Sequence, residues 1–175
     1  HEAAAWLAKL GAATEATPFE RLADACGRGD LAAARRVIDE NPGLLENLSE
    51  DDRHAAGRLA QQGKTAALAA MIDLGVPVNA RGGHDQTALH WASWHGWRDT
   101  VKALLERGAD VAAVETQYGG TPLGWAVHGC GNYPNPDGDY PGVVRLLLAA
   151  GADPSVIEDL PDDVAVADVL RSAGV

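Results

Sequence analysis

The sequence is poor in aromatic residues and in cysteine, and it contains no long apolar run. Only 5% of its 175 residues are aromatic although 46% are hydrophobic, so alanine and leucine must supply most of the core. No run approaches the roughly 20 apolar residues that cross a bilayer, and no signal-peptide pattern is recognised. Two distant cysteines, Cys26 and Cys130, provide no disulfide framework, which favours a reduced, cytoplasmic setting.

Basic residues are also scarce. The 14 lysines and arginines face 25 aspartates and glutamates, which leaves a net charge of −11. Such a field repels the phosphates of nucleic acids and of anionic lipids, so we expect neither nucleic acid nor membrane as a partner. No Walker loop, dinucleotide-binding fingerprint, nucleophile elbow or zinc-protease motif is present, and we expect no cofactor and no metal. The acidic surface favours a neutral or basic partner.

What the sequence does contain is a periodic set of glycines. Four apolar stretches end in glycine, a small residue and an extended segment, as in "LLERGADVA" (104–112). Glycine ends a helix easily because it adopts a positive φ without steric cost. Together with one further glycine, these residues lie 32, 32, 33 and 43 positions apart, at Gly11, Gly43, Gly75, Gly108 and Gly151. A second set marks a turn inside each unit, at Gly29, Gly63 and Gly96.

Each unit therefore predicts a helix, a glycine turn, a second helix, a glycine stop and an extended loop. Residues 84–111 and 119–155 combine this pattern with the starts "TALHWA" and "GTPLGWA", and these segments resemble the ankyrin repeat. The resemblance implies an all-α solenoid of stacked helix-turn-helix units with extended loops, each unit burying its apolar face against the next. It also implies binding of a protein partner by the concave surface, although a fold alone does not establish a function.

We expect one ankyrin-repeat domain over residues 1–175. The resemblance weakens toward the N-terminal half, where "RHAAGRLAQQG" lacks the usual helix start. The expected units are a partial unit at 1–14, full units at 15–47, 48–81 and 82–116, a unit at 117–156 with an insertion at 131–141, and a closing helix at 157–175.

The resemblance places certain positions of each first helix on the concave groove. Trp91, Trp94 and His95 are spaced i, i+3 and i+4 and so share one helix face, and Trp125 and His128 repeat the first spacing one unit later. We expect an aromatic and imidazole patch on units three and four, beside a more polar groove on units one and two. That polar groove consists of Asp24, Arg28, Arg58, Gln61 and Gln62, with Arg58 beside Asp24 as a salt bridge or as a clamp for a carboxylate of the ligand.

A second interpretation applies to some of these residues, since tryptophans at helical spacing also occur in cores. Trp91 and Trp125 can simply shield their neighbours, and Trp97 is expected to be structural. His90 matches the histidine that hydrogen-bonds adjacent units in the family. Gly124 replaces that histidine in the next unit, which leaves space beside Trp125.

The insertion "GCGNYPNPDGDYPG" (129–142) is rich in glycine and proline and is not expected to continue a helix. It should loop out within the fourth unit, near the mouth of the aromatic groove, because long loops in compact folds are often functional. Tyr133 and Tyr140 would then cover the groove, unless the segment is only a solvated surface loop. The "DGD" within it lacks the later bidentate carboxylate of a calcium loop.

The sequence leaves three functions open. The favoured one is a non-enzymatic interaction module that binds a protein or peptide partner through the Trp/His groove. The alternative is a small-molecule-binding protein or a cofactor-free enzyme, in which His95 or His128 acts as general acid or base under the 131–141 loop. The third is a structural scaffold whose tryptophans are mostly buried.

Overall fold

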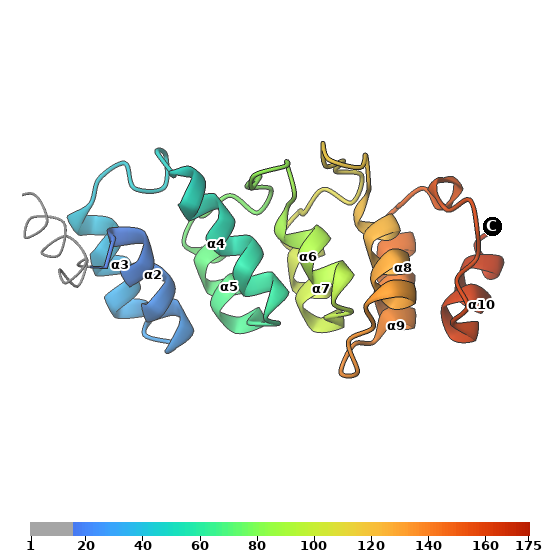
Figure 1. Cartoon of the computed structure of the whole chain (residues 1–175). Coiled ribbons are helices and arrows are strands. Elements are labelled where there is room, and N and C mark those ends of the chain that lie inside the picture. The colour runs from blue at the N-terminus through green and yellow to red at the C-terminus, as the bar shows by residue number, and fades with distance from the viewer. Residues whose placement is uncertain (1–15) are drawn as a thin grey trace, which may run out of the picture.

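The computed structural model describes residues 16–175, within which the chain forms nine α-helices, one 3-10 turn and no β-strand (Figure 1). The partial unit expected at 1–14 lies outside the described residues. The elements are α2 (Pro18–Gly27), α3 (Leu31–Glu40), α4 (Glu50–Gln61), α5 (Thr65–Asp73), α6 (Ala88–Trp94), α7 (Arg98–Leu105), α8 (Pro122–Asn132), α9 (Tyr140–Ala149), η1 (Pro154–Val156) and α10 (Val164–Ser172).

The helix boundaries follow from local chemistry at their ends. Thr17 and Glu20 form a reciprocal capping box at the start of α2, and Thr121 accepts a hydrogen bond from the Gly124 N–H at the start of α8. At the other ends, Gly108 and its counterparts in the other units adopt a positive φ, which is 80° at Gly108. The all-α solenoid expected from the resemblance is therefore confirmed.

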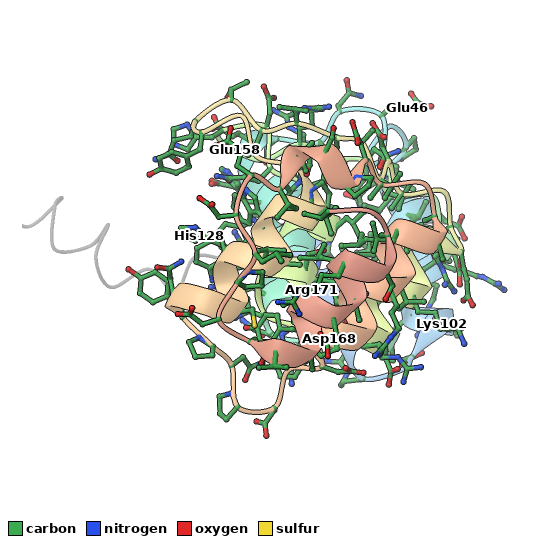
Figure 2. All side chains as sticks on the ribbon, turned by 90° about the vertical axis from the view of Figure 1, so that its right-hand side faces the viewer. Glu46, Lys102, His128, Glu158, Asp168 and Arg171 are labelled. Carbon is green, nitrogen blue, oxygen red and sulfur yellow. The ribbon has the colours of Figure 1, made fainter. Side chains whose placement is uncertain are left out.

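The helices stand in pairs, and the pairs are stacked side by side along the chain (Figure 1). The first helices of the second, third and fourth pairs pack on one another, so α6 lies between α4 and α8, whereas α2 contacts the second pair mainly through α5. Viewed from the C-terminal end, His128 of α8 lies on the opposite flank from Lys102 of α7 (Figure 2). The inner helices α2, α4, α6 and α8 thus share one flank, and the second helices form the other.

The insertion in the fourth unit differs from expectation in both extent and position. Helix α8 continues to Asn132, through residues that were expected to interrupt it, and α9 starts at Tyr140. Gly129 is needed inside α8 because a Cβ there would lie 2.1 Å from the Trp94 carbonyl oxygen of α6. The loop between α8 and α9 projects beyond the ends of these helices, on the side of the molecule opposite the long inter-unit loops (Figure 1). It is fixed to α6 by Asn135, whose side-chain amide donates to the His95 carbonyl at 2.8 Å.

Candidate functional site

Three tryptophans on α6 and α8 form the centre of the candidate site. Trp91 and Trp94 lie one turn apart on α6, and both meet Trp125 of α8 edge to face, with ring centroids 5.2 and 5.4 Å apart. Trp125 is 9% exposed, so it forms the base of the cluster, whereas Trp91 and Trp94 are partly exposed. Most of the surface of Trp125 is therefore buried, as the interpretation of this tryptophan as a shielding residue expects.

Two further rings extend the cluster along Trp94. His128 lies 5.2 Å from Trp94 between ring centroids, and Tyr133 stacks on the same indole at 5.9 Å. Tyr133 remains 68% exposed, although its ring is in contact distance of the indole. Aromatic pairs of this kind contribute about 0.5–1.5 kcal/mol beyond the area that they bury, so the cluster is preformed without a ligand.

These rings line a groove of about 720 Å³. We call it the aromatic groove, and it is lined by Gln86, Trp91, Trp94, Gln117, Tyr118, Gly120, Gly124, Trp125, His128 and Tyr133. The structure thus brings together five of the residues that were predicted to bind a partner, and their role in binding stays a prediction: Trp91, Trp94, Trp125, His128 and Tyr133. None of the indole N–H groups of the three tryptophans donates a hydrogen bond within residues 16–175, whereas that of Trp97 donates to the Gln61 carbonyl at 2.8 Å.

Two predicted site residues lie elsewhere. Tyr140 is 5% exposed, and its hydroxyl donates to the Trp94 carbonyl at 3.1 Å while accepting from the Asn135 N–H. The expectation that Tyr140 covers the groove is wrong, because this tyrosine fastens the insertion to α6. His95 is half-buried and does not line the groove; its Nε2 is shielded without a partner in the described part of the chain, and burial lowers its pKa.

The wall of the groove opposite the helices comes from the loop before α8, which the sequence analysis did not include. Glu115 is buried there, and its carboxylate accepts hydrogen bonds from the backbone N–H groups of Gln117, Tyr118 and Gly120 at 2.7–3.2 Å. Burial alone would raise the pKa of Glu115, but these hydrogen bonds outweigh it and the pKa is lowered. In the sequence, the available signal for this wall was the single acidic residue Glu115 at the start of "ETQYGG" (115–120).

His90 connects the helix to that loop, as the resemblance implied. Its Nδ1 accepts from Thr87, whose N–H and hydroxyl lie at 3.2 and 2.9 Å, and its Nε2 then donates to the Gly120 carbonyl at 3.2 Å. This network assigns the tautomer. Burial lowers the pKa of His90 more than the Gly120 carbonyl and Glu115 raise it. His90 therefore positions the groove wall and leaves no ring nitrogen for a ligand.

The polar groove on units one and two differs from the prediction. Asp24 pairs with Arg28 one turn further along α2 and not with Arg58, so the expected Asp24–Arg58 pair is wrong. Arg58 instead lines a separate hollow of about 260 Å³ between α2 and α4. Gln61 and Gln62 are exposed at the end of α4.

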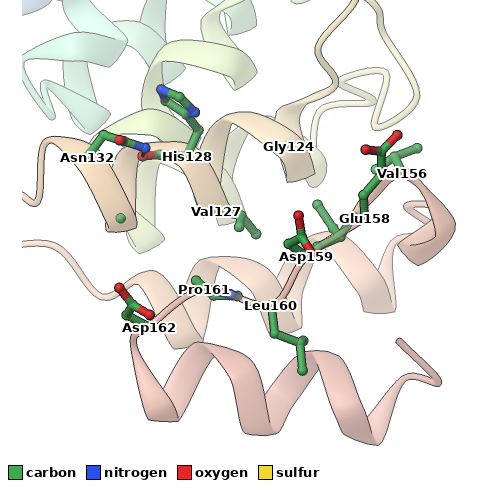
Figure 3. A pocket seen from close by; sticks show the side chains of 12 residues that line it. Gly124, Val127, His128, Asn132, Val156, Glu158, Asp159, Leu160, Pro161 and Asp162 are labelled. Carbon is green, nitrogen blue, oxygen red and sulfur yellow. Dashed lines mark hydrogen bonds between the residues drawn. The ribbon is translucent and has the colours of Figure 1, made fainter.

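A second hollow adjoins the aromatic groove toward the C-terminus (Figure 3). It measures about 530 Å³ and lies between α8 and the segment 156–162. Glu158, Asp159 and Asp162 line it on one side, and Gly124 and His128 on the other. We call it the acidic hollow. Gly124 and His128 line both hollows.

The described residues offer little for covalent or metal chemistry. Cys26 and Cys130 are buried free thiols, and burial raises the pKa of both. Within residues 16–175, no three or more His, Cys, Asp and Glu side chains converge to hold a metal ion. No helix in the same range is long and apolar enough to traverse a membrane. The arrangement is one that presents flat apolar surface, free N–H donors and negative charge.

Comparison with known protein families gives the fold its name. Residues 22–115 and 60–158 each match the model described as ankyrin repeats in three copies. The chain belongs to the ankyrin-repeat family. Ankyrin repeats are generally protein-interaction modules, and in this ankyrin-repeat chain the matched residues include the aromatic groove.

Three relatives with different names share sequence with this chain. The chain is 35% identical over 99 residues to the palmitoyltransferase Hip14 of Drosophila melanogaster, an overlap of 57% of this chain and 14% of that protein. It is 30% identical over 131 residues to serine/threonine-protein kinase 12 of Arabidopsis thaliana, covering 72% and 26%. It is 32% identical over 112 residues to the probable E3 ubiquitin-protein ligase XBOS32 of Oryza sativa subsp. japonica, covering 63% and 23%. The chain thus spans about a quarter or less of each relative.

Proposed function

We propose that this ankyrin-repeat chain is a protein-interaction module that binds a peptide segment of its partner in the aromatic groove. The carrying observation is the groove itself: exposed aromatic rings from two units surround a hollow of about 720 Å³. Tyr118 and Tyr133 are 80% and 68% exposed, so both rings present apolar surface that a partner could cover. Tryptophan and tyrosine are the residues most enriched among binding hot spots.

The unpaired indole N–H groups support a peptide as the occupant. Trp91, Trp94 and Trp125 each carry an indole N–H that donates to no group within residues 16–175. The carbonyl oxygens of an extended peptide are matching acceptors for any of these donors that the groove exposes. Of the segment 131–141, which was expected to close the groove, Tyr133 alone lines it. A groove that this loop does not close suits an extended segment better than an enclosed small molecule.

The enzymatic alternative has weaker support. It required a histidine inside a lidded, desolvated groove, and the ring of His95 does not line the groove. His128 does, but it is exposed to solvent and carries no hydrogen bond to an orienting carboxylate within the described residues. A general base normally needs such a partner to hold its ring and tautomer.

The test is selection of short random peptides displayed on phage against the full chain, followed by calorimetry with the selected sequences. Tyr133→Ala should weaken binding by about 5- to 10-fold, because it removes one exposed ring of the groove. Leu31→Ala is the matched control, since Leu31 is 44% exposed on α3, away from the groove. Selected peptides whose affinity is unchanged by both Tyr133→Ala and Trp94→Ala would exclude the proposal.

A further inference from the structure

The aromatic groove and the acidic hollow are neighbours with a common boundary. Gly124 and His128 on α8 line both of them. In Figure 3, α8 forms one wall of the acidic hollow and the segment with Glu158 and Asp159 forms the other. A ligand that lies across α8 at Gly124 therefore reaches from the tryptophans into the acidic hollow.

Gly124 has no side chain that would stand between the two hollows. A Cβ at this position would meet only the Thr121 hydroxyl oxygen, at 3.7 Å, which is ordinary contact. Packing within the described residues therefore does not require glycine at position 124. At Gly129, by contrast, a Cβ would collide with the Trp94 carbonyl oxygen. A glycine inside a helix is destabilising relative to alanine, and what this glycine provides is an open boundary between the two hollows.

The acidic hollow carries negative charge that the chain does not neutralise. Glu158, Asp159 and Asp162 form no ion pair and accept no side-chain hydrogen bond within residues 16–175. They also do not converge as metal ligands do. Carboxylates spread along one wall suit a cation on a long side chain, and a guanidinium can engage two oxygens at once.

We infer that the partner segment carries a large apolar side chain followed, on the same face, by arginine or lysine. The apolar side chain fills the aromatic groove, the backbone passes over Gly124, and the cation enters the acidic hollow. Alternate side chains of an extended chain project to the same side, so one strand can supply both. This inference rests on the proposed function, because it names the chemistry of the peptide that the groove binds.

The experiment uses synthetic peptides with one leucine or tryptophan and one arginine at varied separation, each paired with a peptide that has citrulline in place of arginine. Citrulline keeps the shape and removes the charge. At the best separation, the arginine peptide should bind about 3- to 10-fold more tightly at low ionic strength. That advantage should shrink as salt is raised, because exposed charges are screened.

Two variants locate the effect. Asp159→Asn/Asp162→Asn should abolish the advantage of arginine over citrulline, while Asp39→Asn/Glu46→Gln should preserve it, since that control removes the same charge from exposed positions far from the hollow. Gly124→Leu should weaken the arginine peptide more than a peptide with only the apolar residue, because the new side chain stands between the two hollows. Circular dichroism confirms that each variant is folded.

The outcomes separate this inference from the proposed function. Equal affinity of the arginine and citrulline peptides, with binding still sensitive to Tyr133→Ala, would overturn the inference and retain the aromatic groove. An arginine advantage that survives Asp159→Asn/Asp162→Asn would also overturn it. Peptide binding that neither Tyr133→Ala nor Trp94→Ala weakens would overturn the proposed function and this inference with it.

Discussion

The inner helices of the two halves occupy equivalent places in the stack, yet their exposed faces are opposite in character. On α2, Asp24 and Arg28 neutralise each other, and α4 ends in exposed glutamines. On α6 and α8, aromatic rings surround a hollow, and the indole N–H groups of its three tryptophans have no partner in the described structure. Both halves bury small residues at the helix contacts, such as Ala25 and Ala92. The buried face sets the stack, and the exposed face is free to differ between units.

The halves also differ in how closely their helices approach. The α6–α8 contact requires Gly129, whose missing side chain leaves room for the Trp94 carbonyl. No glycine on α2 meets a neighbouring helix in this way; Gly27 has nothing within 4 Å. The site is therefore built on the tightest inner contact, which fixes the tryptophans relative to one another.

Substitution of Gly129 by alanine should give the largest effect on stability. The new Cβ would lie 2.1 Å from a backbone oxygen, so α6 and α8 must separate, at a cost of about 2–4 kcal/mol in the free energy of unfolding. Urea denaturation followed by circular dichroism measures this. The matched control is Gly131→Ala on the same helix, where nothing lies within 4 Å and alanine should stabilise by about 0.5 kcal/mol. Equal effects of the two variants would show that close approach does not distinguish this half.

Replacement of His90 by alanine should come next, at about 2–3 kcal/mol, because it leaves a cavity and a buried Thr87 donor without its partner. The Gly120 carbonyl also loses one of its two donors and keeps only the Glu115 N–H. Peptide affinity should fall as well, since the loop wall of the groove loses its attachment to α6. His84→Ala is the control, because His84 is exposed and should change stability by less than about 0.5 kcal/mol. A stable His90 variant with normal peptide affinity would contradict the positioning role.

The repeat architecture could be predicted from sequence because its signals are local. Glycines such as Gly75 and Gly108 follow an apolar helical stretch at a regular spacing and adopt the positive φ that ends the helix. His90 was placed correctly because its partner lies at a fixed place in the next unit. The extent of the insertion was misjudged because Gly129 lies inside α8, where it allows the Trp94 backbone of α6 to come close. Composition does not reveal a contact with a neighbouring helix.

The candidate site was predictable only on its helical side. Trp91 and Trp94 share a face by spacing alone and both line the groove, whereas His95, which was grouped with them by the same spacing, does not. Tyr118 was missed because its position depends on Glu115, a buried carboxylate whose hydrogen bonds fold the loop back over the groove. Tyr140 was misassigned because its hydroxyl finds a backbone partner on another helix. Side chains that act through tertiary hydrogen bonds leave no periodic trace in the sequence.

The pH dependence of stability should sharpen the comparison further. Burial lowers the pKa of both His90 and His95 from the ordinary value of 6.5, so the unfolded chain binds more protons than the folded chain just below that pH. Stability is therefore complete above about pH 6.5 and falls as the pH falls below it. The lowered pKa of Glu115 acts only below its ordinary value of 4.5. The interval between these values thus reports the two histidines, and both lie in the C-terminal half.

Hydrogen exchange between pH 7 and about pH 5, corrected for intrinsic rates, measures this loss unit by unit. Amides of α6 to α8 should lose more protection than those of α2 and α3. In His90→Gln/His95→Gln, the difference between the halves should largely disappear. Uniform loss of protection along the chain would instead show that acid acts on the whole stack.

The smallest effect is expected from the charges of the N-terminal half. Asp24 and Arg28 are both mostly exposed and lie on one helix, so Asp24→Asn should change the free energy of unfolding by less than about 0.5 kcal/mol. Asp73 offers the comparison, since it accepts two hydrogen bonds of 2.9 Å from Arg107 of the next unit, and Asp73→Asn should cost up to about 1 kcal/mol. Denaturation curves of the two variants decide the order. If Asp24→Asn proved the more damaging, the polar inner face would be structural, and the contrast between a solvated half and a binding half would fail.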